Sequence, residues 1–463
     1  MTIPRFRGCF AGFKGEFPSL LTAFVLSPQQ DKALESTYAL DASAMIHLAS
    51  RTRKHTNSFR ITITLFETID PVSLQQAVNR IVPRFPTIIA GIRRGIFQYS
   101  VLPVTSPPKV APDTQPLAPM GNEEIKNCAV RFLYKENAIS VEIFHALTDG
   151  NGGMTAAITL VAEYLRIRYG AHIVPEGILA DLAVKPEKAE LSDDYQRCAS
   201  TNQKPPAYTQ TWQIPSKEQP DLTVFLASKS FDAGIVRNAA RRYGVSVTAF
   251  LSGIMLASVL ELKERYPASR KVVQIMVPVN LRKLLPSCSL RNFSLYALLR
   301  TPSETPNPSL SALIRSCSEQ LTEQNQADYM SAAVSSTMLA QNHVLYRILP
   351  LSLKSRILRW IHRMIGEQTS CISLSNLGRI DLPEEMQKWI SGIDIALTPR
   401  IASPYNCGVV TYGNQLTIQF SRSCPEPALE TIFFQNLDKE IHLYMTFNKL
   451  QTGFKHSANN PVV

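Results

Sequence analysis

Hydrophobic and polar residues alternate over residues 137–145, and the pattern predicts a strand that leads into a turn and a helix. A period of two is typical of a half-buried strand, and the apolar positions are Ile139, Val141 and Ile143. His145 has the same parity, so its imidazole is expected to point inward if the strand runs that far. The sequence Asn-Gly-Gly at 151–153 allows a sharp turn, after which apolar residues recur at helical spacing to about residue 170.

The same two periodicities predict strands and helices along most of the remaining chain. Strands are expected over 59–67, 87–102, 129–134, 222–231, 272–279, 293–299 and 370–377, with a hairpin over 409–420. Helices are expected over 71–82, 232–242, 248–265, 310–326, 351–366 and from Pro425 towards Lys449. The strand at 272–279 is apolar almost throughout, which is typical of a strand buried on both faces.

Each half of the chain contains a strand followed by an Asp-capped helix, at Asp70 in the first half and at Asp232 in the second. This weak repeat predicts two similarly built lobes. Residues 171–220 are polar and rich in proline, so we expect them to connect the lobes. The predicted organisation is a loosely ordered extension at 1–37, a first lobe at 38–200, a second lobe at 201–450 and a tail at 451–463.

Composition limits the size of the protein and the class of its partners. Of the 463 residues, 45% are apolar and 18% are charged, as in a globular protein with two or three domains or one two-lobed unit. The net charge of +11 fits a basic face on a soluble protein, or the capture of an anionic ligand such as a phosphorylated cofactor. No run of Lys and Arg is interleaved with aromatic residues, which argues against nucleic acid.

The cysteines and the apolar runs favour a soluble protein in a reducing compartment. The eight cysteines include no Cys-x-x-Cys pair, which disfavours a zinc ribbon or a redox motif and fits free thiols in the cytoplasm. No apolar run approaches the roughly 20 residues that span a bilayer. The helix at 351–366 is basic and amphipathic, and we expect an ordinary solvated face there rather than a contact with a membrane surface.

The polar residues at the end of the 137–145 strand are the strongest candidates for chemistry. His145 is followed four residues later by Asp149 and then by Gly150, and a histidine near a carboxylate can act as a general base at neutral pH. The alternative is a core histidine bonded to the backbone. The sequence contains no nucleophile elbow, phosphate-binding loop, dinucleotide fingerprint or His-Glu-x-x-His helix, and nothing in it implies a tightly bound metal.

Three polar clusters at other strand ends are candidates to join the histidine. The clusters contain Asn280 with Arg282, Asn292, and Ser375 with Asn376. Arg282 is the natural partner of Asp149, because a charge that emerges from a buried strand needs a counter-ion. The alternatives are turn-capping roles for the Asn and Ser side chains and a surface role for the arginine.

Several segments resemble one enzyme superfamily. FHALTDG, which contains His145 and Asp149, is similar to the His-x-x-x-Asp-Gly motif of the condensation-domain and acyl-CoA-dependent acyltransferase superfamily. VPVNLRK looks like its arginine-bearing strand, and RNFSLYA looks like the strand that follows. SLSNLG and NCGVVTYGNQLTIQF resemble the bacterial branch usually called alcohol-acetyltransferase-like. The likeness covers residues 38–449, nearly the whole chain.

The resemblance implies an α/β fold of two chloramphenicol-acetyltransferase-like lobes, each an α+β two-layer sandwich, around a central tunnel. The acyl thioester is expected to enter the tunnel from one side and the acceptor from the other. His145 is implied as the general base, with Asp149 salt-bridged to Arg282 and shaping the turn. The expected supporting positions are Gly150, Asn280 and Asn292.

Two departures from the pattern of the superfamily narrow the prediction. Phe144 stands where peptide-forming condensation domains usually carry another histidine, which argues against that branch. The Asp-Phe-Gly-Trp-Gly loop of the plant acyltransferases is absent. The group that stabilises the oxyanion is therefore unassigned, and Ser375 and Asn376 are candidates for that role or for substrate binding.

The expected function is ester formation, with acyl-CoA as donor, an alcohol as acceptor and no tightly bound cofactor. The first alternative takes the acyl group from an acyl carrier protein in trans and passes it to an alcohol or an amine. The second alternative is a two-lobed binding protein without catalytic activity. A large distance between Asp149 and Arg282, or a His145 sealed from any tunnel, would favour this second alternative.

Overall fold

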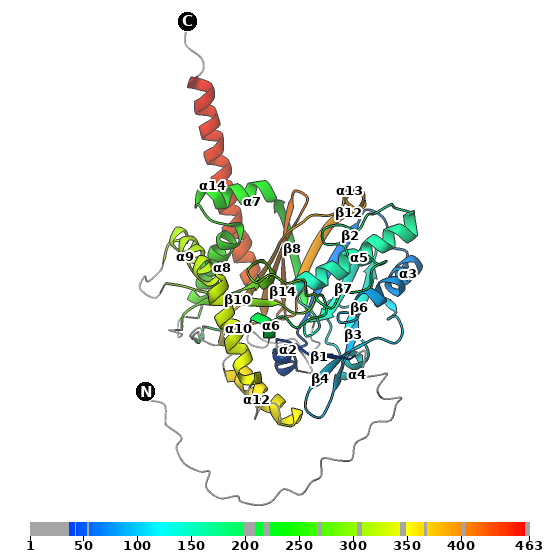
Figure 1. Ribbon diagram of the computed structural model, residues 1–463. Coiled ribbons are helices and arrows are strands. Elements are labelled where there is room, and N and C mark those ends of the chain that lie inside the picture. The colour runs from blue at the N-terminus through cyan, green and yellow to red at the C-terminus, as the bar shows by residue number, and fades with distance from the viewer. Residues whose placement is uncertain are drawn as a thin grey trace, which may run out of the picture. The chain divides into compact units, whose positions relative to one another are not determined.

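The computed structural model describes most of the chain from Thr37 onwards (Figure 1). The described residues are 37–41, 43–52, 55–198, 209–215, 223–266, 271–302, 308–342, 349–364, 368–400 and 403–458. The predicted N-terminal extension lies outside them apart from Thr37. The predicted lobe boundary at 200–201 and residues 459–463 of the predicted tail also lie outside them.

The first lobe contains a five-stranded sheet with the strand order β12-β2-β7-β6-β5. Its strands are β12 (Ile390–Leu397), β2 (Ser58–Leu65), β7 (Ala138–Phe144), β6 (Val130–Lys135) and β5 (Val110–Pro112). Neighbouring strands are antiparallel except β5 and β6. Helices α3 (Pro71–Ile81) and α5 (Gly150–Tyr169) pack against each other and against this sheet, and together they close one hydrophobic core.

Local signals set the ends of these two helices. Asp70 is the N-cap of α3, and its side chain accepts a hydrogen bond from the backbone N–H of Ser73 at 2.8 Å. Helix α5 ends at Gly170, whose φ of +64° lies in the left-handed region that glycine adopts without a steric penalty. Both ends lie where the sequence pattern predicts them.

The second lobe contains a six-stranded sheet with the strand order β10-β9-β11-β13-β14-β8. Its strands are β10 (Ser294–Arg300), β9 (Gln274–Asn280), β11 (Ser373–Ile380), β13 (Tyr405–Tyr412), β14 (Gln415–Arg422) and β8 (Phe225–Asp232). Its helices include α7 (Ala233–Arg242), α8 (Val247–Glu264), α9 (Leu310–Gln324) and α14 (Ala428–Ala458). Helix α8 packs against α9 and α14 and is buried along most of its length, as its largely apolar sequence requires.

Strand β12 links the two lobes. It comes from the segment that the sequence assigns to the second lobe, but it is an edge strand of the first sheet and also contacts β13 and β14. Where it passes β13, a Cβ on Gly408 would lie 2.2 Å from the carbonyl oxygen of Ile395. Only glycine allows two backbones to approach this closely, so the lobes share a backbone contact.

Shorter elements surround the two large sheets. A three-stranded sheet joins β1 (Tyr38–Ala39), β4 (Tyr99–Pro103) and β3 (Ala90–Arg94). The other described helices are α2 (Ala44–Ser50), α4 (Asn122–Asn127), α6 (Tyr195–Cys198), α10 (Ala327–Asn342), α12 (Leu351–Met364) and α13 (Glu384–Gln387), with 3-10 turns η1 (Val82–Arg84) and η2 (Leu281–Lys283). Several elements have no counterpart among those that the sequence predicts: α2, α4, α6, α10, α13, β1, β5 and β12. The single strand predicted over 87–102 is two antiparallel strands, β3 and β4.

Two strands differ in burial from the prediction. Strand β7 is buried on both faces rather than half-buried, because Ser140 and Glu142 are only 1% and 0% exposed. Arg60 and Arg131 pair with Glu142 at 3.0 and 3.3 Å, so a buried ion-pair cluster covers the face that was expected to meet water. Strand β9 is buried at its start, but its last three residues are half-buried.

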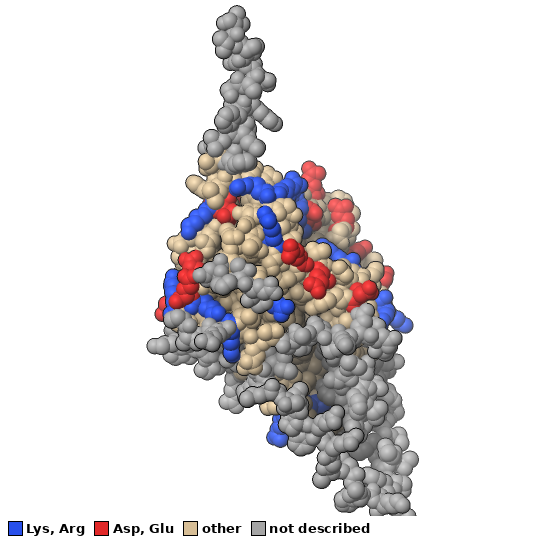
Figure 2. Space-filling model, turned by 90° about the vertical axis from the view of Figure 1, so that its left-hand side faces the viewer, with Lys and Arg blue, Asp and Glu red and all other residues tan. Residues whose placement is uncertain are grey.

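The structure also shows the state of the cysteines, the length of the apolar helices and the distribution of surface charge. The seven described cysteines are free thiols. Among the described residues, no single helix has the length and hydropathy to cross a bilayer, and the pair α7 and α8 reaches both only across a bend of 78°. Basic and acidic side chains are interspersed on the face shown in Figure 2, so the net charge of +11 is not gathered into one basic field there.

The contact between β12 and β13 predicts a loss of stability for Gly408→Ala. The added methyl group would meet the carbonyl oxygen of Ile395 at 2.2 Å, and overpacking of this kind costs about 1–3 kcal/mol. Gly392→Ala on β12 is the matched control, because nothing lies within 4 Å of its Cβ position. Calorimetry should show a lower unfolding temperature for Gly408→Ala alone, and equal temperatures for the two variants would contradict the contact.

Candidate active site

His145 is the first residue after β7, at the point where the chain leaves the first sheet. Its backbone N–H donates to the carbonyl oxygen of Asn57 at 2.7 Å. This bond extends the backbone pairing of β7 with β2 by one residue on each strand. The residue as a whole is half-buried. It is therefore less deeply buried than the strand residues that directly precede it.

The imidazole lies between two other rings. The ring of His47, on α2, stacks on it with the centroids 4.3 Å apart and an interplanar angle of 11°. Phe59, on β2, meets it edge-on at 5.0 Å and 64°. Both arrangements are favourable for aromatic rings, and together they hold the plane of the imidazole.

A chain of polar contacts sets which ring nitrogen carries the proton. Nδ1 of His145 lies 3.2 Å from Oδ1 of Asn292, and Nδ2 of Asn292 lies 3.4 Å from Oδ2 of Asp41. Because the Asp41 carboxylate accepts hydrogen bonds, the Asn292 amide turns its NH₂ group to Asp41 and its carbonyl oxygen to the imidazole. Nδ1 therefore carries the proton, and Nε2 keeps the lone pair that a general base needs.

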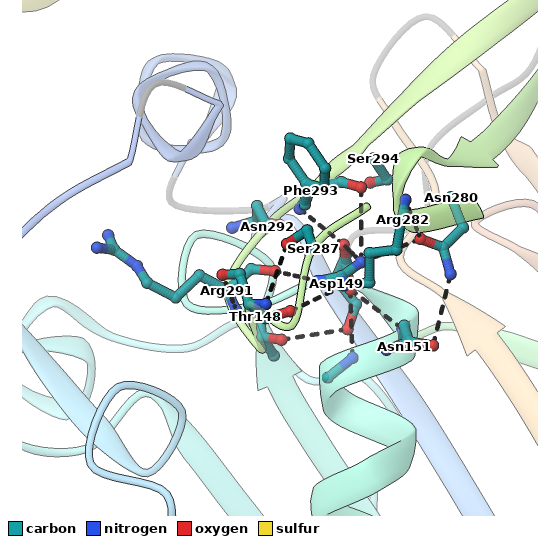
Figure 3. A network of polar contacts seen from close by, with 12 residues as sticks. Thr148, Asp149, Asn151, Asn280, Arg282, Ser287, Arg291, Asn292, Phe293 and Ser294 are labelled. Carbon is teal, nitrogen blue, oxygen red and sulfur yellow. Dashed lines mark hydrogen bonds and ion pairs between the residues drawn. The ribbon is translucent and has the colours of Figure 1, made fainter. Parts of the chain in front are cut away.

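Asp149 uses both carboxylate oxygens to join α5 to the second lobe. As the N-cap of α5, it accepts hydrogen bonds at Oδ1 from the backbone N–H groups of Asn151 and Gly152, at 3.1 and 3.2 Å. At Oδ2 it accepts from Nη1 of Arg282 at 2.7 Å and from the backbone N–H of Phe293 at 2.8 Å. Figure 3 shows the side chain at the centre of this network. These four bonds fit a carboxylate that holds the turn rather than one that polarises the imidazole.

Arg282 carries the network to the loop at 289–293. Its Nε and Nη2 donate to the carbonyl oxygens of Ser289 and Arg291, at 2.8 and 2.6 Å. Its Nη1 also lies 3.2 Å from Oδ1 of Asn280, which accepts from the backbone N–H of Arg282 and so caps the turn η2. The guanidinium group therefore binds a carboxylate and the backbone of the loop at once.

The same loop is held from the first lobe and in turn holds the residues that contact the histidine. The hydroxyl of Thr148 donates to the carbonyl oxygen of Leu290 at 2.6 Å. Arg291 pairs with Asp41 at 3.6 Å, and Asn292 follows it in the loop. The ion pair, the loop and the Asn292 amide therefore form one continuous support for the imidazole.

The glycines that follow the carboxylate serve packing rather than a turn. A turn does precede the helix, at residues 145–147. Residues 151–153 lie in the first turn of α5, so only the predicted position of the turn at these residues is wrong. A Cβ on Gly152 would lie 2.2 Å from the carbonyl oxygen of Leu290, and a Cβ on Gly153 would lie 2.6 Å from the ring of Phe59. The absence of these Cβ atoms lets the helix approach the loop and β2 closely.

Burial controls the protonation of both histidines. It lowers the pKa of His145 below the ordinary value of 6.5, because the imidazolium loses its hydration. The carbonyl group of His145 itself, then Asp149 and then Asn292, oppose this shift. The pKa of His47 lies well below its ordinary value, first through burial and then through the neighbouring His145 and His362. Both rings are therefore neutral at pH 7, and His145 is ready to accept a proton.

Ser375 and Asn376 lie in β11 of the second sheet. The Asn376 amide donates to the hydroxyl of Thr248 at 3.0 Å and accepts from the backbone N–H of Gly378 at 2.9 Å, so both of its halves are engaged locally. Ser375 is buried. The described contacts do not join either side chain to His145, and an oxyanion role for either stays a prediction.

Gly150 marks the place where β11 meets the helix that begins at the site. A Cβ on Gly150 would lie 2.8 Å from Cδ2 of Leu377, the residue that follows the two candidates. Leu377 in the middle of β11 therefore lies beside the first turn of α5, within the same region as the ion pair.

Two residues around the histidine, Asp41 and His47, are missed by sequence reasoning. Asp41 lies just before α2 and His47 lies within it, and this helix of seven residues is too short to show a clear hydrophobic periodicity. The only sequence feature that points to the site is a histidine inside the apolar segment AMIHLAS, and this segment matches no motif. Their place beside His145 comes from contacts between distant segments.

The described residues around the site provide few groups that could bind a metal ion or a phosphate. Among the described residues, no three His, Cys, Asp or Glu side chains converge to hold a metal ion. A pocket of about 470 Å³ opens beside Arg282 and is also lined by Asn151, Thr155, Ser287 and Cys288. Its two arginines, Arg84 and Arg282, are paired with Glu190 and Asp149, so their charges are already matched.

Comparison with known proteins finds likeness in structure but not in sequence. No protein-family model and no curated protein matches the chain. Polyketide synthase associated protein 5 from Mycobacterium tuberculosis is 14% identical over 87% of this chain and 97% of its own, with a TM-score of 0.53. The epimerization domain from the third module of tyrocidine synthetase B is 12% identical over 89% and 97%, with a TM-score of 0.56. A variant of the starter condensation domain of rhizomide synthetase, solved in complex with C8-CoA, is 15% identical over 90% and 96%, with a TM-score of 0.55.

These matches concern the fold, because the identities are low. Each covers nearly the full length of the neighbour and most of this chain, so the likeness includes both lobes. The chain therefore shares the two-lobed α/β fold of these condensation and epimerization domains.

Proposed function

We propose that the chain is an acyltransferase that moves an acyl group from acyl-CoA to an alcohol, with His145 as the general base. The observation that carries the proposal is the contact between Nδ1 of His145 and Oδ1 of Asn292 at 3.2 Å. This contact leaves the lone pair of Nε2 free of the Asn292 amide on a half-buried residue, at a site built from both lobes.

The reaction balances with one base and no further reagent. Nε2 removes the proton of the acceptor hydroxyl as the oxygen attacks the thioester carbonyl, so that a C–O bond forms and the carbonyl oxygen becomes an oxyanion. The intermediate then collapses, the C–S bond breaks, and the leaving thiolate takes the proton back from Nε2. The products are an ester and a free thiol, and a base of this kind contributes about 10²–10⁴-fold to the rate.

The network around the ring favours the imidazolium that exists between the two proton transfers. The Nδ1–H group donates to Asn292, and the charges of Asp149 and Asp41 raise the pKa of His145 against the effect of burial. Neither carboxylate has to take up a proton, so each acts through its charge and its position. The oxyanion needs separate donors, for which Ser375 and Asn376 remain the candidates.

The choice of acyl-CoA as donor has two supports. Coenzyme A is anionic, and a net charge of +11 attracts it. One structural neighbour, the starter condensation domain of rhizomide synthetase, was solved with C8-CoA. Transfer from a carrier protein to an alcohol or an amine is the second candidate, since another neighbour is a polyketide synthase associated protein. Rates with free acyl-CoA and with an acyl carrier protein separate the two donors.

Two observations favour an enzyme over a two-lobed binding protein. Asp149 and Arg282 are 2.7 Å apart rather than distant, and His145 as a residue is half-buried rather than fully buried. A binding protein has no need of a histidine whose tautomer is set by an oriented amide.

His145→Ala should abolish ester formation from acyl-CoA while the fold stays intact. Loss of the base predicts a fall in kcat of about 10²–10⁴-fold, measured as thiol release and ester production by the purified full-length chain. His172→Ala is the matched control, since His172 is exposed and lies outside the site. Wild-type turnover by His145→Ala would remove the histidine from the mechanism.

The activity should fall on acidification with a midpoint below pH 6.5. Burial lowers the pKa of His145 from 6.5, so the ring stays neutral, and active as a base, until the pH falls through this lowered value. In Asn292→Asp a carboxylate would face Nδ1 and stabilise the imidazolium, which should move the acidic limb of kcat/KM to higher pH. Identical acidic limbs in the two proteins would show that this contact does not tune the base.

Two replacements of Arg282 should distinguish the effect of its positive charge from the effect of its hydrogen bonds to the loop. Arg282→Met leaves a buried carboxylate without its partner, and such a change costs about 3–5 kcal/mol of stability. Arg282→Lys keeps the charge but lacks the donors that hold Ser289 and Arg291, so kcat should fall about tenfold or more with a smaller loss of thermal stability.

Arg80→Lys is the control for the lysine variant, because Arg80 is 64% exposed and its ion pair with Glu163 lies away from the loop. It should change neither quantity measurably. A wild-type kcat in Arg282→Lys would mean that the 289–293 loop does not depend on the guanidinium group.

A further inference from the structure

Helix α12 packs with its less apolar side inward. Leu351 and Lys354 are buried, at 1% and 6% exposed, and Nζ of Lys354 donates to the carbonyl oxygen of Phe97 at 2.9 Å. The apolar residues at 353, 357, 360 and 361 recur at helical spacing on another side. These side chains are exposed: Leu353 43%, Ile357 39%, Trp360 65% and Ile361 41%.

A second element with exposed apolar side chains is bonded to the first turn of α12. The turn between β3 and β4 presents Ile96 and Phe97, which are 75% and 52% exposed. The backbone N–H of Leu351 donates to the carbonyl oxygen of Ile96 at 2.8 Å, so the turn is fastened to the first residue of α12. The apolar patch consists of Ile96, Phe97, Leu353, Ile357, Trp360 and Ile361.

The charged side chains on the two segments that carry the apolar patch have one sign. Arg93 and Arg94 at the end of β3 are exposed, and so are Arg356 and Arg359 on α12. Residues 90–103 and 351–364, which supply the patch and its surroundings, contain no Asp or Glu. Basic residues beside exposed Trp, Phe, Ile and Leu are typical of a helix that lies in the interface of an anionic bilayer.

The apolar patch lies one helix away from the candidate active site. Helix α12 packs against α2, and α2 carries His47, which stacks on His145. His362 of α12 lies near enough to His47 that its positive charge lowers the pKa of His47. In Figure 1, α12 and α2 lie next to each other at the lower end of the described chain, below the two large sheets.

The charge pattern selects among the possible occupants of the patch. A second copy of the chain joined through the same face would bring the four arginines of each copy towards those of the other, and such like-charge contacts are unfavourable. An anionic bilayer attracts basic residues near its surface and pairs these arginines with lipid headgroups. It also takes the apolar side chains out of water.

We propose that the apolar patch docks the protein on the surface of an anionic lipid bilayer. Docking presents the α2–α12 side of the protein, which leads to His145, to molecules held in the membrane. Long-chain alcohols and long-chain acyl thioesters are the substrates that this arrangement favours, a consequence that rests on the proposed acyltransferase function. The docking itself does not depend on that function.

Vesicle flotation with the full-length chain tests the docking. The probes are vesicles of phosphatidylcholine alone and of phosphatidylcholine mixed with phosphatidylglycerol. Wild type should float with the mixed vesicles, and the bound fraction should fall as salt is added. Trp360→Glu combined with Ile361→Glu should weaken this binding about tenfold or more, and Ile96→Ser with Phe97→Ser should do the same from the other element.

Phe66→Ser is the matched control, because Phe66 is exposed to the same 65% as Trp360. Its backbone is bonded to Trp389, at the end of the first sheet beside α13, so it lies on another part of the protein. It should bind mixed vesicles as wild type does. The thermal unfolding temperature of every variant shows whether the fold is kept.

Three results would overturn the docking. The first is that wild type does not bind the mixed vesicles. The second is that both patch variants bind these vesicles as strongly as wild type does. The third is that wild type forms a dimer, that the patch variants are monomers, and that none of these proteins binds vesicles. The last result would assign the face to an interface between copies. An assay with a soluble short-chain acyl-CoA and a short alcohol runs alongside, and its failure in wild type would count against the acyltransferase function while the vesicle result stands.

Discussion

One buried ion pair, between Asp149 and Arg282, ties the site together across the two lobes. A carboxylate with so little contact with water is tolerated only when its charge and its lone pairs are matched. Four donors match it here, two from the first turn of α5 and two from the second lobe. The positive end of the α5 dipole adds to the same stabilisation. The start of α5 and the 289–293 loop are therefore positioned by one interaction.

The ion pair takes no direct part in the proposed chemistry. It positions the loop whose Asn292 side chain contacts His145. The loop held by Arg282 carries Asn292, and Asn292 with Asp41 decides which nitrogen of His145 is protonated. The stacked ring of His47 and the edge of Phe59 hold the plane of the imidazole. The ionised groups support the site, and the neutral imidazole, with a pKa lowered by burial, is left to move the proton.

The surface near the site follows a different constraint. Helix α12 is bonded to the β3–β4 turn through backbone and lysine donors, and this attachment decides which of its sides faces inward. The apolar side remains outside, next to exposed arginines. The same helix packs on α2.

The sequence by itself determined the elements whose signals are local. The alternation in β2 and β7, the Asp70 cap of α3 and the glycine at the end of α5 depend on neighbouring residues alone. The pairing of Asp149 with Arg282 was also predictable, because a buried charge requires a counter-ion. Only the tertiary structure decided the rest: β12 joins the first sheet, His47 covers the site, and α12 turns its apolar side outward. His145 and Asn292 are 147 residues apart, and no local pattern encodes which distant segments fold against each other.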